Sequence, residues 1–126
     1  MKADAIIVGS GIVGMSLAIT LSRQNKKVII IEKNFSNNLN NNRFYALSEK
    51  TKNFFENINI WNNIKNINSL NEMHLYYRNF ENRSMINFRR DDIQKKNIGY
   101  IAQSKEIMKA LIDEIEKDNN INLYDN

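Results

Sequence analysis

The sequence predicts an α/β fold in which a parallel β-α-β unit is followed by an antiparallel β-hairpin. Residues 3–8 and 28–31 are short apolar runs of the kind that forms buried strands. Between them, residues 11–24 place their apolar side chains on one face of a helix. Strand, helix and strand in this order over about thirty residues are typical of a βαβ unit with a right-handed crossover.

The middle of the chain predicts a surface loop and a second helix. The Asn-rich residues 34–42 are interpreted as the loop. Ser48 is expected to cap a helix that reaches about residue 58. Asn59 is expected to end this helix in a left-handed conformation, and Trp61 is expected in the core.

The last third of the chain predicts a hairpin, a helix and a strand. Residues 73–79 and 84–89 alternate apolar and polar side chains, which is the pattern of a β-hairpin. A capped helix is expected to begin at Ser104 and reach about residue 117. Residues 121–124 predict one more strand, which would be the third of the parallel sheet.

Composition limits the class of protein. With 126 residues, 42% of them apolar, the chain supports one modest domain at most. No apolar run approaches the roughly 20 residues that span a bilayer, and the start lacks the pattern of a signal peptide, so a cytoplasmic protein is expected. Cysteine is absent, which excludes disulfides and thiolate metal sites. The net charge of +4 is spread along the chain without a nucleic-acid-binding motif, so no nucleic-acid partner is expected.

A G-x-G-x-x-G motif lies between the first predicted strand and the first helix. Gly9 permits the tight turn, Gly11 allows close approach of a pyrophosphate, and Gly14 allows the helix to pack on the sheet. The amides at the start of this helix, around Ile12 and Val13, would face the phosphates with a partial positive charge. The motif therefore predicts a Rossmann-like dinucleotide-binding unit.

An acidic residue at the end of the second strand agrees with this interpretation. Glu32 can accept hydrogen bonds from both hydroxyls of an adenosine ribose, and it would repel the 2′-phosphate of NADP. Lys33, which follows it, is included as a candidate cofactor contact. FAD and NAD share the same ADP half, so the motif alone leaves both open.

The chain resembles the FAD-dependent aromatic hydroxylases of the p-hydroxybenzoate-hydroxylase-like class. The segment Arg43-Phe44-Tyr45-Ala46-Leu47-Ser48 is similar to the R-x-x-A-L-S segment of the ubiquinone-biosynthesis hydroxylases, a family that includes 2-octaprenyl-6-methoxyphenol hydroxylase. Residues 98–102 are similar to its L-G-Y-I-V segment. The chain departs from the pattern at three positions: Asn25 replaces the usual Gly, Asn41 replaces Asp, and Gln103-Ser104 replaces Glu-Asn.

The resemblance implies a cofactor, a reaction and an arrangement of domains. FAD would be reduced by NAD(P)H as co-substrate and would use O₂ to hydroxylate an aromatic ring, so no catalytic side chain and no metal are expected. Arg43 would contact the phosphate and ribityl region of FAD, and Gln103 would be a further contact. Residues 1–70 and 98–126 would belong to the FAD-binding domain, and residues 71–97 would form the first hairpin of a substrate domain.

The family is about three times longer, so the resemblance implies an N-terminal fragment that binds FAD weakly and is inactive alone. Its substrate would be a small aromatic molecule, such as a polyprenyl phenol met at the inner membrane. Its partners would be the missing C-terminal part or other ubiquinone-biosynthesis proteins. Two alternatives stay open: a small non-catalytic module that binds NAD or FAD, and a scaffold that binds neither.

Overall fold

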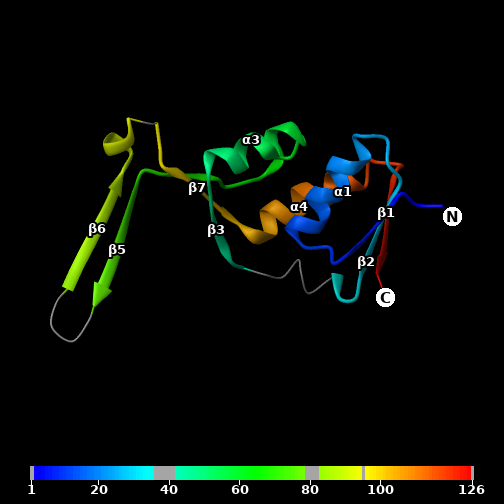
Figure 1. Cartoon of the computed structure of the whole chain (residues 1–126), viewed down its shortest axis with the longest axis horizontal. Helices are drawn as coiled ribbons and strands as arrows, with labels where there is room; N and C mark the ends of the chain where they lie inside the picture. The colour runs from blue at the N-terminus through cyan, green and yellow to red at the C-terminus, as the bar shows by residue number, and fades with distance from the viewer. Residues whose placement is uncertain (1, 36–41, 79–82, 95, 126) are drawn as a thin grey trace.

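The computed structural model describes residues 2–35, 42–78, 83–94 and 96–125. A parallel sheet lies at one end of the molecule, helices and a small antiparallel sheet lie in the middle, and a long hairpin projects at the other end (Figure 1). The α/β class with a parallel sheet is confirmed.

The parallel sheet consists of β1 (Ala5–Val8), β2 (Val28–Glu32) and β8 (Ile121–Asp125), in the order β1-β2-β8. Helix α1 (Ile12–Ser22) connects β1 to β2 and packs beside α4 (Ser104–Ile115). The two helices lie on one side of the sheet (Figure 1). The predicted βαβ unit and the predicted third parallel strand are therefore present, and α1 and α4 each end two residues earlier than expected.

A second, antiparallel sheet joins segments that are far apart in the sequence. Strand β7 (Gly99–Gln103) lies between β3 (Phe44–Leu47) and β4 (Asn68–Leu70) and pairs with both. None of these three strands follows from the sequence pattern, because each has five residues or fewer and pairs with a distant partner. The sheet leads from the helices to the hairpin.

Helix α3 (Glu49–Asn57) begins and ends as its sequence predicts. The Ser48 hydroxyl accepts a hydrogen bond from the Thr51 backbone N–H at 3.2 Å. Asn59 has a left-handed backbone with φ of 58°, a conformation that Asn tolerates. Trp61, in a short 3₁₀ turn (Trp61–Asn63), is buried and packs edge-to-face on Tyr100 with ring centroids 5.0 Å apart.

Helix α4 begins at Ser104 as predicted, but the expected side-chain cap is missing. Gln103 occupies the N-cap position and makes no capping hydrogen bond with its side chain. Ser104 is the first helical residue, is buried, and donates its backbone N–H to the Arg43 carbonyl at 2.7 Å. Pairing between β3 and β7 therefore determines where α4 begins, because it draws this amide toward β3.

Among the described residues, one core connects the parallel sheet, the β3-β7-β4 sheet and the helices α1, α3 and α4. Fully buried side chains come from α1, β2 and α4, and others follow α3: Met15, Ile19, Val28, Ile30, Ile60, Ile107 and Leu111. None of the described helices has the length and hydrophobicity that crossing a bilayer requires.

The predicted hairpin is formed by β5 (Glu72–Arg78) and β6 (Arg83–Arg89), which pair antiparallel along their whole length. A 3₁₀ turn (Arg90–Ile93) follows, and in it Asp91 and Asp92 are exposed, as expected for a solvated turn. Residues 79–82 and most of the Asn-rich segment, including Asn41, lie outside the described residues.

Candidate nucleotide-binding site

The glycine-rich turn joins β1 to α1 and depends on close backbone contact. Gly9 has a φ of +103°, which glycine adopts without strain. A Cβ atom at Gly14 would lie 2.1 Å from the Gly9 carbonyl oxygen, so a side chain there would push α1 away from the turn. At Gly11 an added Cβ would meet no atom within 4 Å, so the backbone there is open to a ligand.

The first turn of α1 is available to an anion. Gly11 is its N-cap residue and supplies no capping side chain, and Ile12 and Val13 follow as the first helical residues. The N–H groups at the start of a helix lack intrahelical partners and carry the positive end of the helix dipole. Together with the bare backbone of Gly11, they form the type of site that binds phosphate.

Glu32 turns toward this loop from the end of β2. Its Oε2 atom accepts hydrogen bonds from the Ser10 backbone N–H at 2.8 Å and from the Ser10 hydroxyl at 3.0 Å. Its Oε1 atom accepts from the backbone N–H groups of Lys33 and Asn34 at 2.8 and 3.0 Å. These donors, above all the Ser10 backbone N–H, lower the pKa of Glu32 from 4.5 to about 2. The carboxylate is therefore ionised at neutral pH, as an acceptor for ribose hydroxyls must be.

Arg43 and Gln103 come together although they are distant in the sequence. In the antiparallel register of β3 and β7, Phe44 lies opposite Gln103, and the Arg43 carbonyl accepts the N–H of Ser104. The Arg43 residue is exposed and Gln103 is half-buried. The structure thus places the two predicted flavin contacts at one end of the antiparallel sheet.

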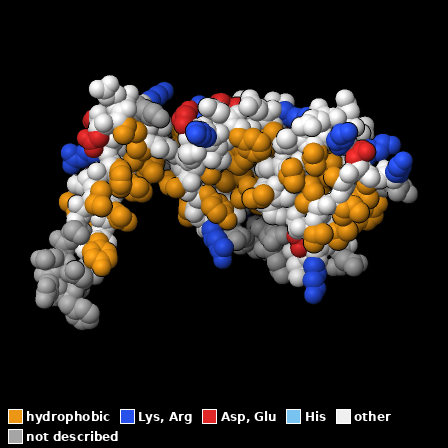
Figure 2. Space-filling view, in the orientation of Figure 1, with side chains coloured by type: hydrophobic (Ala, Val, Ile, Leu, Met, Phe, Trp, Pro, Cys, Tyr) orange, Lys and Arg blue, Asp and Glu red, His pale blue; other side chains and the backbone are white. Residues whose placement is uncertain are grey.

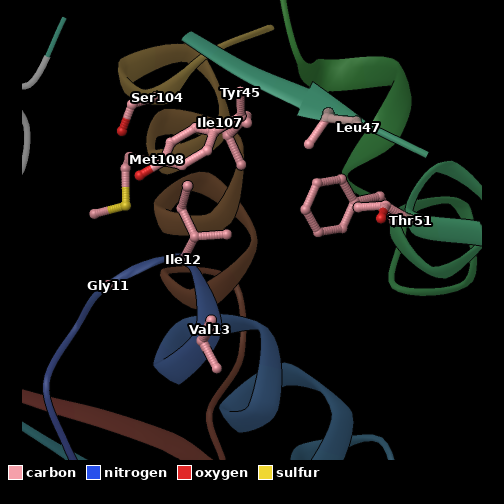
Figure 3. Close-up of a pocket in the computed structure, with 10 residues that line it drawn as sticks. Gly11, Ile12, Val13, Tyr45, Leu47, Thr51, Ser104, Ile107 and Met108 are labelled. Atoms are coloured by element: carbon pink, nitrogen blue, oxygen red, sulfur yellow. The ribbon is translucent and has the colours of Figure 1, made fainter. Parts of the chain in front are cut away.

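A pocket of about 430 Å³ connects this end of the sheet with the start of α1. Its walls come from α1, β3, α3 and α4, and Figure 3 shows the residues that line it. Most of the lining is apolar, with hydroxyl groups from Ser104, Thr51 and Tyr45. The residues that line it are Gly11, Ile12, Val13, Tyr45, Leu47, Thr51, Phe55, Ser104, Ile107 and Met108.

The sequence analysis missed several residues of this region. Tyr45 and Leu47 lie two and four residues after Arg43, so in a strand all three would share one face. This period of two could have identified them from the sequence. The place of Met108 in the pocket depends on how α4 meets α1. The sequence analysis gave no site role to Ser10, and it named Ser104 only as the start of a helix.

Other polar side chains lie away from the site. His74 is on the hairpin, where its Nδ1 atom is 2.6 Å from the Asn87 side-chain oxygen. Within the described ranges, no cluster of three or more His, Asp or Glu side chains could hold a metal ion. The donor set instead suits a dinucleotide: a carboxylate for a ribose, helix amides for a pyrophosphate, and an adjoining apolar pocket.

Comparison with known proteins agrees with this geometry. Residues 4–46 match the model of an FAD binding domain family. The chain is 25% identical over 143 aligned residues to the mitochondrial ubiquinone biosynthesis monooxygenase COQ6 of Dictyostelium discoideum, covering 97% of this chain and 28% of that protein.

Solved structures extend the similarity to nearly the whole fold. PqsL, a probable FAD-dependent monooxygenase from Pseudomonas aeruginosa, matches with a TM-score of 0.74 at 16% identity, over 98% of this chain and 32% of its own. The flavin-dependent monooxygenase PieE, solved with FAD and substrate, matches with a TM-score of 0.77 at 14% identity, over 99% of this chain and 24% of its own.

The chain thus spans about a third or less of the length of these proteins. The expected resemblance to FAD-dependent aromatic hydroxylases is confirmed at this level. Residues 4–46 match the FAD binding domain family, and nearly the whole chain has a fold similar to part of the solved FAD-dependent monooxygenases.

Proposed function

We propose that the chain is the FAD-binding portion of a flavin-dependent monooxygenase that hydroxylates an aromatic ring, with NAD(P)H as co-substrate. The observation that carries this proposal is the Glu32 carboxylate, which is ionised and turned toward the open glycine-rich turn. A carboxylate in this place binds the ribose of an ADP group. The FAD binding domain match covers both the turn and Glu32.

Each predicted contact has a role in this proposal. Glu32 binds the adenosine ribose. The backbone N–H of Lys33 helps to hold the Glu32 carboxylate. The amides that follow Gly11 bind the pyrophosphate. Arg43 and Gln103 bind the flavin's phosphate and ribityl region, which is supported by their shared position at one end of the antiparallel sheet. Bound FAD supplies the redox chemistry, and these residues orient it.

The hairpin is proposed as the first part of a substrate domain, over residues 71–97, with residues 1–70 and 98–126 forming the FAD-binding domain. One face of the hairpin pairs Met73 with Phe88 and Leu75 with Ile86, and all four side chains are exposed. Such an apolar face suits an aromatic substrate. PqsL has been solved with 2-aminobenzoylacetate, which supports a small aromatic ligand for this fold.

A role in ubiquinone biosynthesis is proposed from the similarity to the COQ6 monooxygenase. The substrate would then be a polyprenyl phenol, reached by peripheral contact with a membrane. Because the chain spans only 28% of that relative, we also propose that it binds FAD weakly and does not hydroxylate by itself. Substrate-dependent oxygen consumption by the purified 126-residue chain would contradict this part of the proposal.

Titration of the purified chain with FAD, followed by flavin fluorescence, tests the proposed function. Glu32→Ala is expected to weaken FAD binding by about tenfold or more, because a charge-assisted hydrogen bond contributes about 1.5–3 kcal/mol. Glu116→Ala, which removes an exposed carboxylate just after α4, serves as the control. Absence of FAD binding by the unaltered chain would refute the proposal. Tighter binding of NAD than of FAD would favour a non-catalytic nucleotide-binding module instead.

A further inference from the structure

Ser10 occupies the first variable position of the glycine-rich turn, and its side chain is enclosed. Its relative exposure is 0%, although it lies between two residues whose backbones are accessible. Its hydroxyl donates to Glu32 Oε2 at 3.0 Å, the same oxygen that accepts from its backbone N–H at 2.8 Å. A side chain that is fully enclosed does not contact a ligand directly, so any effect on binding passes through Glu32.

The contacts around Glu32 hold both ends of its carboxylate. Oε1 is held by backbone N–H groups of Lys33 and Asn34, which come from the same strand end. Oε2 is held from the other side of the crevice by Ser10, which comes from the turn after β1. Of these four donors, only the Ser10 hydroxyl belongs to a side chain, and so it alone depends on residue type.

We propose that Ser10 is a positioning residue, whose hydroxyl holds the Glu32 carboxylate in the orientation in which it meets the ribose hydroxyls of the nucleotide. This inference rests on the proposed function. Without the hydroxyl, a glutamate side chain at a strand end would rotate about its own bonds, and binding would have to order it again. Fixing a binding group in advance raises affinity by removing this cost.

The hydroxyl also favours the charged form of the carboxylate. Donors to a carboxylate stabilise its ionised state, and the Ser10 side chain is one of the groups that lower the pKa of Glu32. Two charged residues flank Glu32: Lys33 follows it in the sequence, and Asp125 is its partner on β8. Asp125 is a carboxylate and donates no hydrogen bond, and the hydrogen bond that Lys33 gives comes from its backbone N–H and goes to Oε1.

The test uses the full chain, with ADP and 2′-deoxy-ADP as probes in calorimetric titrations. Ser10→Ala is expected to weaken ADP binding by up to about tenfold, which is the cost of ordering one side chain on binding. It is expected to weaken binding of 2′-deoxy-ADP less, so that the preference for the intact ribose falls. In a Glu32→Ala background, Ser10→Ala is expected to have little further effect, since coupled residues are not additive.

Two further variants separate positioning from folding. Ser16→Ala removes another buried serine hydroxyl, one that has no hydrogen-bond partner among the described residues, and it should bind ADP as the unaltered chain does. Ser10→Ala removes the hydroxyl and keeps the Cβ atom. Ser10→Gly removes both. Equal losses in both Ser10 variants would assign the effect to the hydroxyl, while a loss in Ser10→Gly with none in Ser10→Ala would assign it to packing of the Cβ atom and overturn the proposal.

A carboxyl titration of Glu32 by ¹³C NMR, made without nucleotide, gives an independent readout. Ser10→Ala should raise the Glu32 pKa from about 2 toward 4.5. An unchanged pKa together with unchanged ADP affinity would overturn the proposal. If the unaltered chain binds no ADP, the proposed function fails, but this titration still decides whether Ser10 holds the carboxylate.

Discussion

The parallel sheet and the β5–β6 hairpin both carry apolar side chains along their strands, but they differ in what covers those side chains. On β2, Val28 and Ile30 are fully buried, because α1 and α4 pack on that face of the sheet. On the hairpin, Leu75 and Ile86 lie opposite each other and remain 54% and 53% exposed. Figure 2 shows hydrophobic side chains along the hairpin surface.

This difference separates the part of the chain that provides its own core from the part that presents a surface. Hydrophobic stabilisation scales with the apolar area removed from water, so the helix-covered sheet contributes most of it. The hairpin depends on cross-strand side-chain pairs, and each pair stabilises the fold less than a buried core side chain does. The opposite face of the parallel sheet resembles the hairpin, since Ile6, Val8 and Tyr124 are exposed there.

The largest expected effect compares one leucine from each region. Leu111→Ala, in the buried face of α4, should lower the free energy of unfolding by about 2–5 kcal/mol, because it leaves a cavity in the core. Leu75→Ala, on the hairpin, should lower it by less than about 1 kcal/mol. Denaturation by urea, followed by circular dichroism, measures both, and equal losses would contradict the division into core and surface.

A second comparison separates folding from binding within the glycine-rich turn. Gly14→Ala should destabilise the fold by about 1–3 kcal/mol or more, since its Cβ would lie 2.1 Å from a backbone oxygen. Gly11→Ala should change the free energy of unfolding by less than about 1 kcal/mol, because its Cβ meets open space. It should nevertheless weaken FAD binding, by blocking approach to the backbone. Thermal melts with and without FAD distinguish the two variants.

The acid stability of the nucleotide-binding end should depend on Glu32. Because its pKa is lowered from 4.5 to about 2 by folding, the ionised carboxylate stabilises the native state fully above pH 4.5. This contribution should be lost as the pH falls from 4.5 toward 2. Glu32→Gln should therefore be less stable than the unaltered chain at pH 6 and should approach it near pH 3. Asp113→Asn, which changes an exposed carboxylate on α4, serves as the control, and parallel stability curves for Glu32→Gln and the unaltered chain would contradict the expectation.

The smallest expected effect concerns single polar contacts outside the core. Ser48→Ala should lower the free energy of unfolding by about 1 kcal/mol, because it removes the N-cap of α3. His74→Ala should cost less than about 0.5 kcal/mol, because its contact with Asn87 is on the exposed hairpin. Urea denaturation measures both free energies of unfolding, and the loss should be larger for Ser48→Ala than for His74→Ala. A larger loss for His74→Ala would show that the hairpin unfolds more cooperatively with the core than its exposure suggests.

Sequence alone predicted the features that depend on neighbouring residues. The βαβ unit follows from two apolar runs around one amphipathic helix, and the N-cap at Ser48 and the left-handed Asn59 follow from side-chain chemistry at helix ends. The glycine spacing and Glu32 were also predictable, since the motif and its acid lie within one supersecondary unit. At α4 the predicted start at Ser104 is confirmed, but the expected side-chain cap is absent.

Short apolar runs, helix caps and turn residues therefore determined the strands, the helices and the ADP-binding motif of this protein, because each acts over a few residues. Only the tertiary structure decided that β3 and β7 pair. This pairing brings Arg43 close to Gln103 and forms part of the pocket beside α1. The physical reason is that antiparallel pairing joins backbone groups from distant segments, and no local periodicity specifies the partner of so short a strand.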